Sequence, residues 1–108
     1  MPMKTLTYNF AEEFTVSPGG RYEARSEKSG EEFRKAVLQP LLEKYDRVIL
    51  DLNGVFGFPP SFLDEVFGPL VKKYGRSELE RRLAISLSDD DVALRVISSV
   101  YEKHSSRT

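Results

Sequence analysis

Hydrophobic and polar positions alternate at the start of the chain and recur at helical spacing further along it. Within residues 4–10 (KTLTYNF), Leu, Tyr and Phe occupy every second position, which predicts a strand with one buried face. Two short stretches, residues 14–16 and 21–24, flank the sequence SPGG. Proline followed by glycine suits the central positions of a type II turn, so we expect an N-terminal β-hairpin here.

Three longer segments carry apolar residues three and four apart, which is the spacing of an amphipathic helix. The first covers residues 29–45, the second 61–74 and the third 88–101. Ser29, with an acidic residue three positions later, forms a capping-box signature for the first helix. A proline falls inside each of the first two segments, and we expect a kink at each.

Two further apolar runs lie between these helices, at residues 47–52 (RVILDL) and 83–87 (LAISL). The first run lacks alternation, which is typical of a central strand covered on both faces. Strands that alternate with helices predict an α/β layer with right-handed crossovers. We therefore expect a single α/β domain over residues 1–108, with about three helices packed against its sheet. Residues 104–108 are expected to be a frayed tail.

Composition narrows the classes of function. Hydrophobic residues make up 40% and charged residues 31% of the 108 positions, which is typical of a globular domain with one modest core. The net charge of −1 provides no global attraction to nucleic acid or to an acidic membrane. The apolar runs are too short to span a bilayer, and the N-terminus lacks the apolar region of a signal peptide. With no cysteine, we expect a cytoplasmic protein without thiolate metal sites, and nothing indicates a cofactor.

One motif suggests catalysis. The stretch VILDLNGV resembles the first motif of haloacid-dehalogenase-type phosphatases, in which an Asp nucleophile is followed two residues later by a general acid. Asp51 would be the nucleophile, and Asp89 and Asp90 could imitate the magnesium-binding acids. Asn53 replaces the general acid, however, and an amide cannot donate and recover a proton. The alternative is that Asp51 bonds the backbone of the turn that follows it. The single histidine, His104, is expected to complement the dipole of the last helix. We expect no enzyme and no metal site.

The stretch FPPSFLDE offers two roles for Ser61. The hydroxyl could cap the second helix, since Asp64 follows three residues later. A phosphate on the same hydroxyl would meet the positive end of the helix dipole. Both interpretations are kept: a helix cap or a phosphorylation switch.

Four segments together, PGGRY, SGEEFR, LDLNG and SFLDEVFGPLV, resemble the STAS-like family of unknown function, and more distantly the STAS domains of anti-sigma-factor antagonists. The resemblance implies a STAS-like fold with a mixed sheet and a protein partner, such as an ATPase-type kinase. In those antagonists an Asp, a phosphorylated Ser and a second Ser follow one another. An ungapped match places Pro59 on the Asp, Pro60 on the phosphorylated Ser and Ser61 on the second Ser.

We therefore expect a non-enzymatic regulatory or protein-interaction module. Its docking surface would be the 56–62 loop and the start of the following helix, through the residues Phe56, Phe58, Phe62 and Glu65. A second hypothesis is a small anion- or nucleotide-binding domain, in which Arg21 and Arg34 face the backbone N–H groups at the start of that helix. It predicts that the N-terminal hairpin and the Ser61 loop converge in space, and it fails if they lie on opposite ends of the sheet. The phosphatase is the third and weakest hypothesis.

Overall fold

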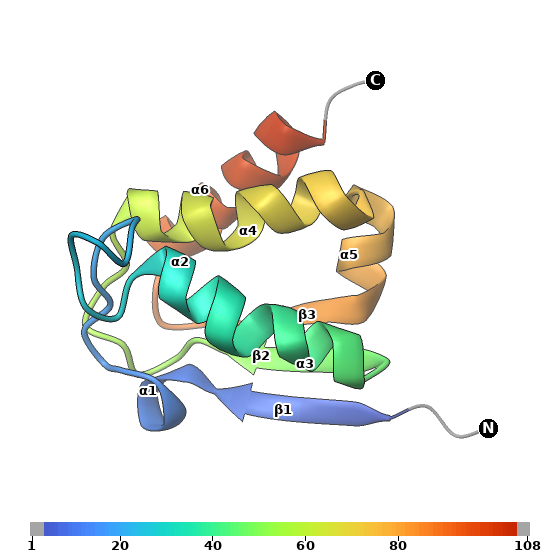
Figure 1. Ribbon diagram of the computed structural model, residues 1–108, viewed down its shortest axis with the longest axis horizontal. Helices are drawn as coiled ribbons and strands as arrows, with labels where there is room; N and C mark the ends of the chain where they lie inside the picture. Colours follow the sequence, from blue (N-terminus) through green and yellow to red (C-terminus); the bar gives the residue numbers. More distant parts are fainter. Residues whose placement is uncertain (1–3, 106–108) are drawn as a thin grey trace.

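A three-stranded, entirely parallel sheet is the base of the domain (Figure 1). The structure is a computed structural model and describes residues 4–105. The strands are β1 (Thr5–Asn9), β2 (Arg47–Asp51) and β3 (Leu83–Ser86), in the spatial order β1-β2-β3. Both neighbouring pairs are parallel, so the α/β class is confirmed and the mixed sheet is wrong.

The crossover segments are helical and lie on one side of the sheet (Figure 1). One continuous helical segment joins β1 to β2, two consecutive helices join β2 to β3, and a last helix follows β3. Their bounds are α2 (Gly30–Phe33), η1 (Arg34–Leu38), α3 (Gln39–Lys44), α4 (Pro60–Tyr74), α5 (Arg76–Arg82) and α6 (Asp91–His104). The short α1 (Phe10–Glu13) follows β1 directly. The three expected helices are therefore present, and α1 and α5 are additional.

The hydrophobic core fills the space between the sheet and these helices. In β2, Val48 and Leu50 are buried, whereas Ile49 between them is half-buried. Ile49 pairs in register with the exposed Thr7 of β1 and with Ala84 of β3. The expectation that β2 is covered on both faces is therefore wrong. Successive right-handed crossovers that advance in the same direction across a parallel sheet place their helices on the same face.

Five phenylalanines form the end of the core nearest the carboxyl ends of the strands. Phe10, the first residue of α1, is fully buried, and its ring centroid lies 4.9 Å from that of Phe33 and 5.8 Å from that of Phe62. Phe14 and Phe58 approach the same Phe10 ring to 5.3 and 5.5 Å. Aromatic pairs at such distances add to the stabilisation gained from burial. This cluster anchors the loops before α2 and before α4.

The predicted N-terminal hairpin is absent. Residues 14–29 form an irregular loop that folds back on itself, with the Gly19 N–H donating to the Lys28 carbonyl at 2.8 Å and the Gly30 N–H to the Gly20 carbonyl at 2.9 Å. A Cβ on Gly19 would come within 2.1 Å of the carbonyl oxygen of Glu27. The glycine therefore serves close backbone packing inside a loop, and the Pro-Gly signature does not mark a hairpin turn here.

Both internal prolines are accommodated within continuous helical segments. Pro40 is the second residue of α3, which follows directly on the π-helical segment η1, a local widening of the helix. Pro69 lies inside α4 and lacks the N–H that would bond the carbonyl of Glu65, four residues earlier. That carbonyl instead accepts a hydrogen bond of 3.0 Å from Nε of Arg34. An arginine from the neighbouring helical segment thus satisfies the group that the proline leaves free.

Candidate functional site

Ser61 does not cap α4. The helix begins at Pro60, so the cap position belongs to Pro59 and no side chain caps the first turn. The Pro59 carbonyl accepts from the N–H groups of Phe62 (3.0 Å) and Leu63 (3.3 Å). Proline is favoured at the first helical position, and this preference shifts the serine to the second. By contrast, the Ser29 hydroxyl accepts from the Glu32 N–H at 3.0 Å and caps α2 as expected.

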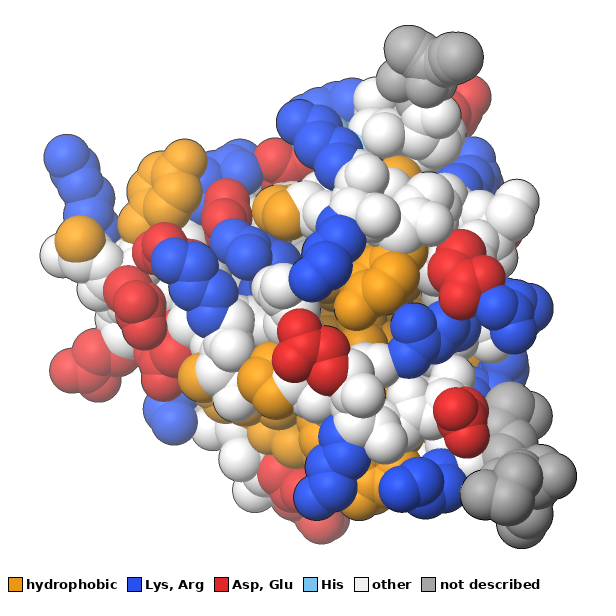
Figure 2. All heavy atoms as spheres, turned by 45° about the vertical axis from the view of Figure 1, so that its right-hand side comes forward, with side chains coloured by type: hydrophobic (Ala, Val, Ile, Leu, Met, Phe, Trp, Pro, Cys, Tyr) orange, Lys and Arg blue, Asp and Glu red, His pale blue; other side chains and the backbone are white. Residues whose placement is uncertain are grey.

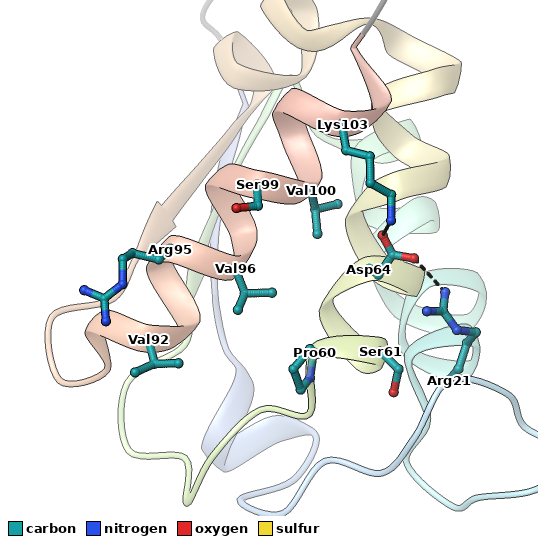
Figure 3. Close-up of a pocket in the computed structure, with 10 residues that line it drawn as sticks. All are labelled: Arg21, Pro60, Ser61, Asp64, Val92, Arg95, Val96, Ser99, Val100 and Lys103. Atoms are coloured by element: carbon teal, nitrogen blue, oxygen red, sulfur yellow. Dashed lines mark hydrogen bonds and ion pairs between the residues drawn. The ribbon is translucent and has the colours of Figure 1, made fainter.

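A groove of about 470 Å³ opens between the first turn of α4 and one face of α6 (Figure 3). Ser61 lies on its α4 side, where its hydroxyl oxygen has no hydrogen-bond partner among residues 4–105. Valines of α6 project into the space between the two helices. The lining consists of Arg21, Pro60, Ser61, Asp64, Val92, Arg95, Val96, Ser99, Val100 and Lys103. The groove thus combines an apolar floor with charged and hydroxyl groups at its edges.

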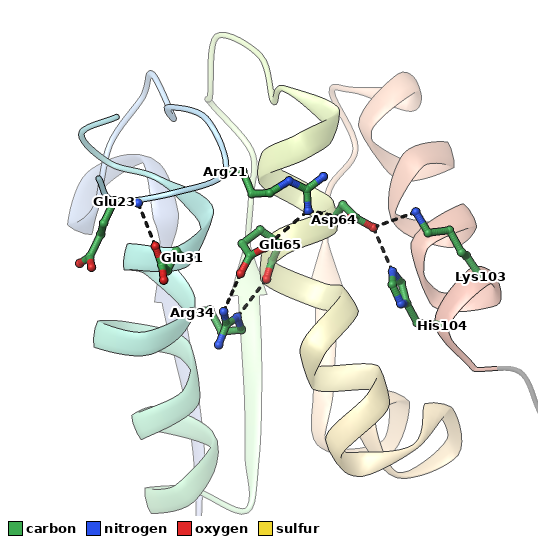
Figure 4. A network of polar contacts seen from close by, with 8 residues as sticks. All are labelled: Arg21, Glu23, Glu31, Arg34, Asp64, Glu65, Lys103 and His104. Atoms are coloured by element: carbon green, nitrogen blue, oxygen red, sulfur yellow. Dashed lines mark hydrogen bonds and ion pairs between the residues drawn. The ribbon is translucent and has the colours of Figure 1, made fainter. Parts of the chain in front are cut away.

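Asp64 is the centre of an ionic cluster beside this groove (Figure 4). Its carboxylate accepts from Nη1 of Arg21 at 2.8 Å and lies 3.0 Å from Nε2 of His104 and 3.4 Å from Nζ of Lys103. Burial alone would raise the pKa of the Asp64 carboxyl, but the hydrogen bonds from Arg21 and His104 and the charge of Lys103 lower it to about 2. The same contact with Asp64 raises the pKa of Arg21. Asp64 therefore joins the loop before α2, helix α4 and the end of α6.

Arg34 and Glu65 form a second, more enclosed pair. Nη2 of Arg34 donates to the Glu65 carboxylate at 2.7 Å, while Nε donates to the backbone carbonyl of Glu65, which Pro69 leaves free. The other Glu65 carboxylate oxygen lies 3.5 Å from Nη1 of Arg21. Arg34 and Glu65 thus fasten the first crossover segment to α4, and their charged groups are already matched to each other.

His104 is not part of a frayed tail. It is the last residue of α6, and its ring lies against α4 at Gly68, where a Cβ would come within 2.9 Å of Nε2. The glycine therefore permits the close approach that brings His104 to Asp64. Sequence reasoning missed this contact, because the two residues are far apart along the chain. Residues 106–108 of the expected tail lie outside the described residues.

The three phenylalanines of the predicted docking surface have different environments. Phe56 is 84% exposed, Phe58 is half-buried against the core, and Phe62 is 1% exposed. The Phe56 N–H donates to the Val16 carbonyl at 2.9 Å, which ties its loop to the loop before α2. Only Phe56 of the three presents its full ring to solvent.

The acidic residues of the suggested phosphatase motif hold loops together. The Asp51 carboxylate accepts two hydrogen bonds from Asn53, one from the backbone N–H and one from the side-chain amide, both 3.0 Å. The Asn53 side-chain oxygen accepts from the Ser88 N–H at 2.8 Å, and Asp89 accepts from the Gly54 N–H at 3.0 Å. The expectation that Asp51 bonds the following turn is confirmed. Within residues 4–105, no group of three or more His, Asp or Glu side chains is placed to hold a metal ion.

The face of the molecule seen in Figure 2 carries both charges. Figure 2 shows Lys and Arg side chains interspersed with Asp and Glu over one face, with an apolar area at its centre. No helix within the described part of the chain has both the length and the apolarity needed to cross a membrane. This face therefore gives no broad field of a single sign, so charge-based recognition on it must be local.

Comparison with known proteins gives one family. A family model described as "STAS-like domain of unknown function (DUF4325)" matches residues 29–93, which is more than half of the chain. No curated protein and no solved structure matches the chain at a significant level. The matched region contains Ser61, Asp64 and Glu65, whereas Arg21 and the end of α6 lie outside it. The description carries no reaction and no ligand to these residues.

Proposed function

The chain belongs to the family of STAS-like domains of unknown function, and within that frame we propose that it is a cytoplasmic, non-enzymatic protein-interaction module. Its docking surface is the loop that carries Phe56 together with the start of α4. A regulatory role through this surface is part of the same proposal.

The observation that carries the proposal is the exposure of Phe56. The Phe56 ring is 84% exposed to solvent. Aromatic side chains contribute much of the binding energy when they are buried in an interface. The loop is held in place by the hydrogen bond from the Phe56 N–H to Val16 and by the half-buried Phe58. A fixed loop loses little conformational freedom on binding, and this lowers the cost of association.

Anion binding by Arg21 and Arg34 is the less favoured function. One observation supports it: Arg21 and Ser61 line the same groove. However, Arg21 is paired with Asp64, and Arg34 with Glu65. Two of the three N–H groups at the helix start donate to the Pro59 carbonyl. A bound anion would have to displace these contacts.

Affinity capture from the source organism tests the proposal. Phe56→Ala should lose the partner that the wild-type protein retains, while Lys73→Ala, an exposed change near the far end of α4, should retain it. Both variants should unfold at the wild-type temperature, because neither side chain is buried. Equal retention by Phe56→Ala and wild type would contradict the proposal. An ATPase-type kinase is one partner class suggested by resemblance, and phosphate found on Ser61 by mass spectrometry would support that class.

A further inference from the structure

We propose that the groove between α4 and α6 binds an acidic segment of a partner protein, whose apolar side chains pack on the valines of α6. The inference rests on the proposed interaction function and specifies the chemistry of the partner. It concerns a surface separate from the Phe56 ring, although the two are close along the chain, since the loop of Phe56 leads directly into Pro60.

The floor of the groove is one stripe of α6. Val92, Val96 and Val100 follow one another at intervals of four residues, so they share one face of the helix. Val92 is 62% exposed while Val100 is buried, so the stripe emerges from the core and becomes accessible towards the beginning of α6. Its length is about 12 Å at 1.5 Å per residue, which accommodates about two turns of a partner helix or a short extended segment.

The edges of the groove carry an excess of positive charge. Arg21, Arg95 and Lys103 line it together with a single carboxylate, Asp64. That carboxylate is already bonded to Arg21 and lies close to Lys103 and His104. Arg95 is exposed and has no ion-pair partner among residues 4–105. Because the whole chain has a net charge of −1, this excess is local and favours an acidic partner over a basic one.

The positions of these cations favour an extended occupant over a compact anion. Figure 3 shows Arg95 and Arg21 on opposite sides of the groove, with Val96 between them. A phosphate or similar ion needs donors that converge on one point. Nucleic acid would likewise place its phosphates on cations, but the aliphatic floor offers its bases no aromatic ring on which to stack. A segment with carboxylates flanking apolar side chains matches both the floor and the edges.

Two synthetic peptides of about 15 residues, long enough to form a helix on binding, provide the test. They share the same leucine positions at helical spacing and differ only in carrying Glu or Lys at the flanking positions. By fluorescence anisotropy, the Glu peptide should bind at least about tenfold more tightly than the Lys peptide. Its binding should weaken as salt rises from about 0.05 to about 0.5 M.

Charge reversal locates the binding site. Arg95→Glu should weaken binding of the Glu peptide by about tenfold or more, whereas the control Lys72→Glu, an exposed reversal on α4 outside the groove lining, should change it little. Both side chains are exposed, so circular dichroism should show both variants folded. Failure of the Glu peptide to bind at millimolar concentration, equal binding of the two peptides, or indifference to Arg95→Glu would each overturn the inference.

The same variants separate this inference from the proposed function. If Phe56→Ala loses the natural partner but Arg95→Glu retains it, the proposed interaction function is supported and the proposal of an acidic segment is contradicted. If both variants release it, both proposals hold. If single-stranded nucleic acid added as a competitor binds in the groove instead, the acidic segment is again wrong.

Discussion

Replacing Asp64 with Asn tests whether the cluster at the start of α4 stabilises the fold through its charge. Asparagine has nearly the same shape and can still accept a hydrogen bond, but it has no negative charge to offer Arg21, His104 and Lys103. The side chain of Asp64 is only 18% exposed, so solvent screens these contacts less than it would on an open surface. We therefore expect Asp64→Asn to lower the free energy of unfolding.

The pKa of Asp64 sets the size of the effect. The folded state lowers it from 3.8 to about 2, and each unit of difference corresponds to about 1.4 kcal/mol. The charged form of Asp64 is thus worth about 2 kcal/mol to the folded state at neutral pH. Because the pKa is depressed in the folded state, this contribution is fully present above 3.8 and is lost as the pH falls through about 2.

Urea unfolding of wild type and Asp64→Asn at a series of pH values measures this directly. The difference should be about 2 kcal/mol from neutral pH down to about pH 4 and should shrink steadily below that. Glu43→Gln, which neutralises an exposed carboxyl elsewhere, should stay within about 0.5 kcal/mol of wild type throughout. A difference between wild type and Asp64→Asn that stays constant down to about pH 2 would refute the argument, since a loss of shape or packing does not titrate.

Two further predictions follow from the helix starts. Ser29→Ala should lower the free energy of unfolding by about 1 kcal/mol because it removes the cap of α2. Ser61→Ala should change the same free energy by less than about 0.5 kcal/mol. If urea titrations gave equal losses for the two variants, the assignment of the caps would be contradicted. Gly30→Ala should cost about 1–3 kcal/mol, because its Cβ would come within 2.6 Å of the Phe62 carbonyl oxygen. A melting temperature at or above the wild-type value would show that α2 and α4 can separate freely.

The elements that repeat a local pattern could be predicted from the sequence. The strands at residues 47–52 and 83–87 and the three amphipathic helices appear close to where their periodicity placed them. The capping signature gave a wrong helix cap at α4, where it overlaps with the proline signature of a first helical position. The motif Ser-x-x-acid occurs at the start of both α2 and α4. At α4, however, the proline before Ser61 takes the first helical position, so the serine lies inside the helix and does not cap it.

The ionic cluster around Asp64 could not be predicted from any pattern along the chain. Arg21 and Asp64 are 43 positions apart, and Asp64 and His104 are 40 apart. No periodicity relates such residues, because only the assembled fold brings the loop before α2 and the end of α6 to the same turn of α4. The exposure of Phe56 beside the half-buried Phe58 was equally undecidable, since both are aromatic residues of one short loop.

The parallel arrangement of the sheet also constrains how the chain folds. Thr5 pairs with Arg47 and Val48 with Leu83, so strand partners lie roughly 35 to 42 residues apart, and no hairpin can form early and hold two strands together. Closing such loops costs conformational entropy before any sheet contact offsets it. The helical segments, whose contacts are local, are therefore expected to form first, with the sheet completed late and the rate of folding limited by its long-range pairing.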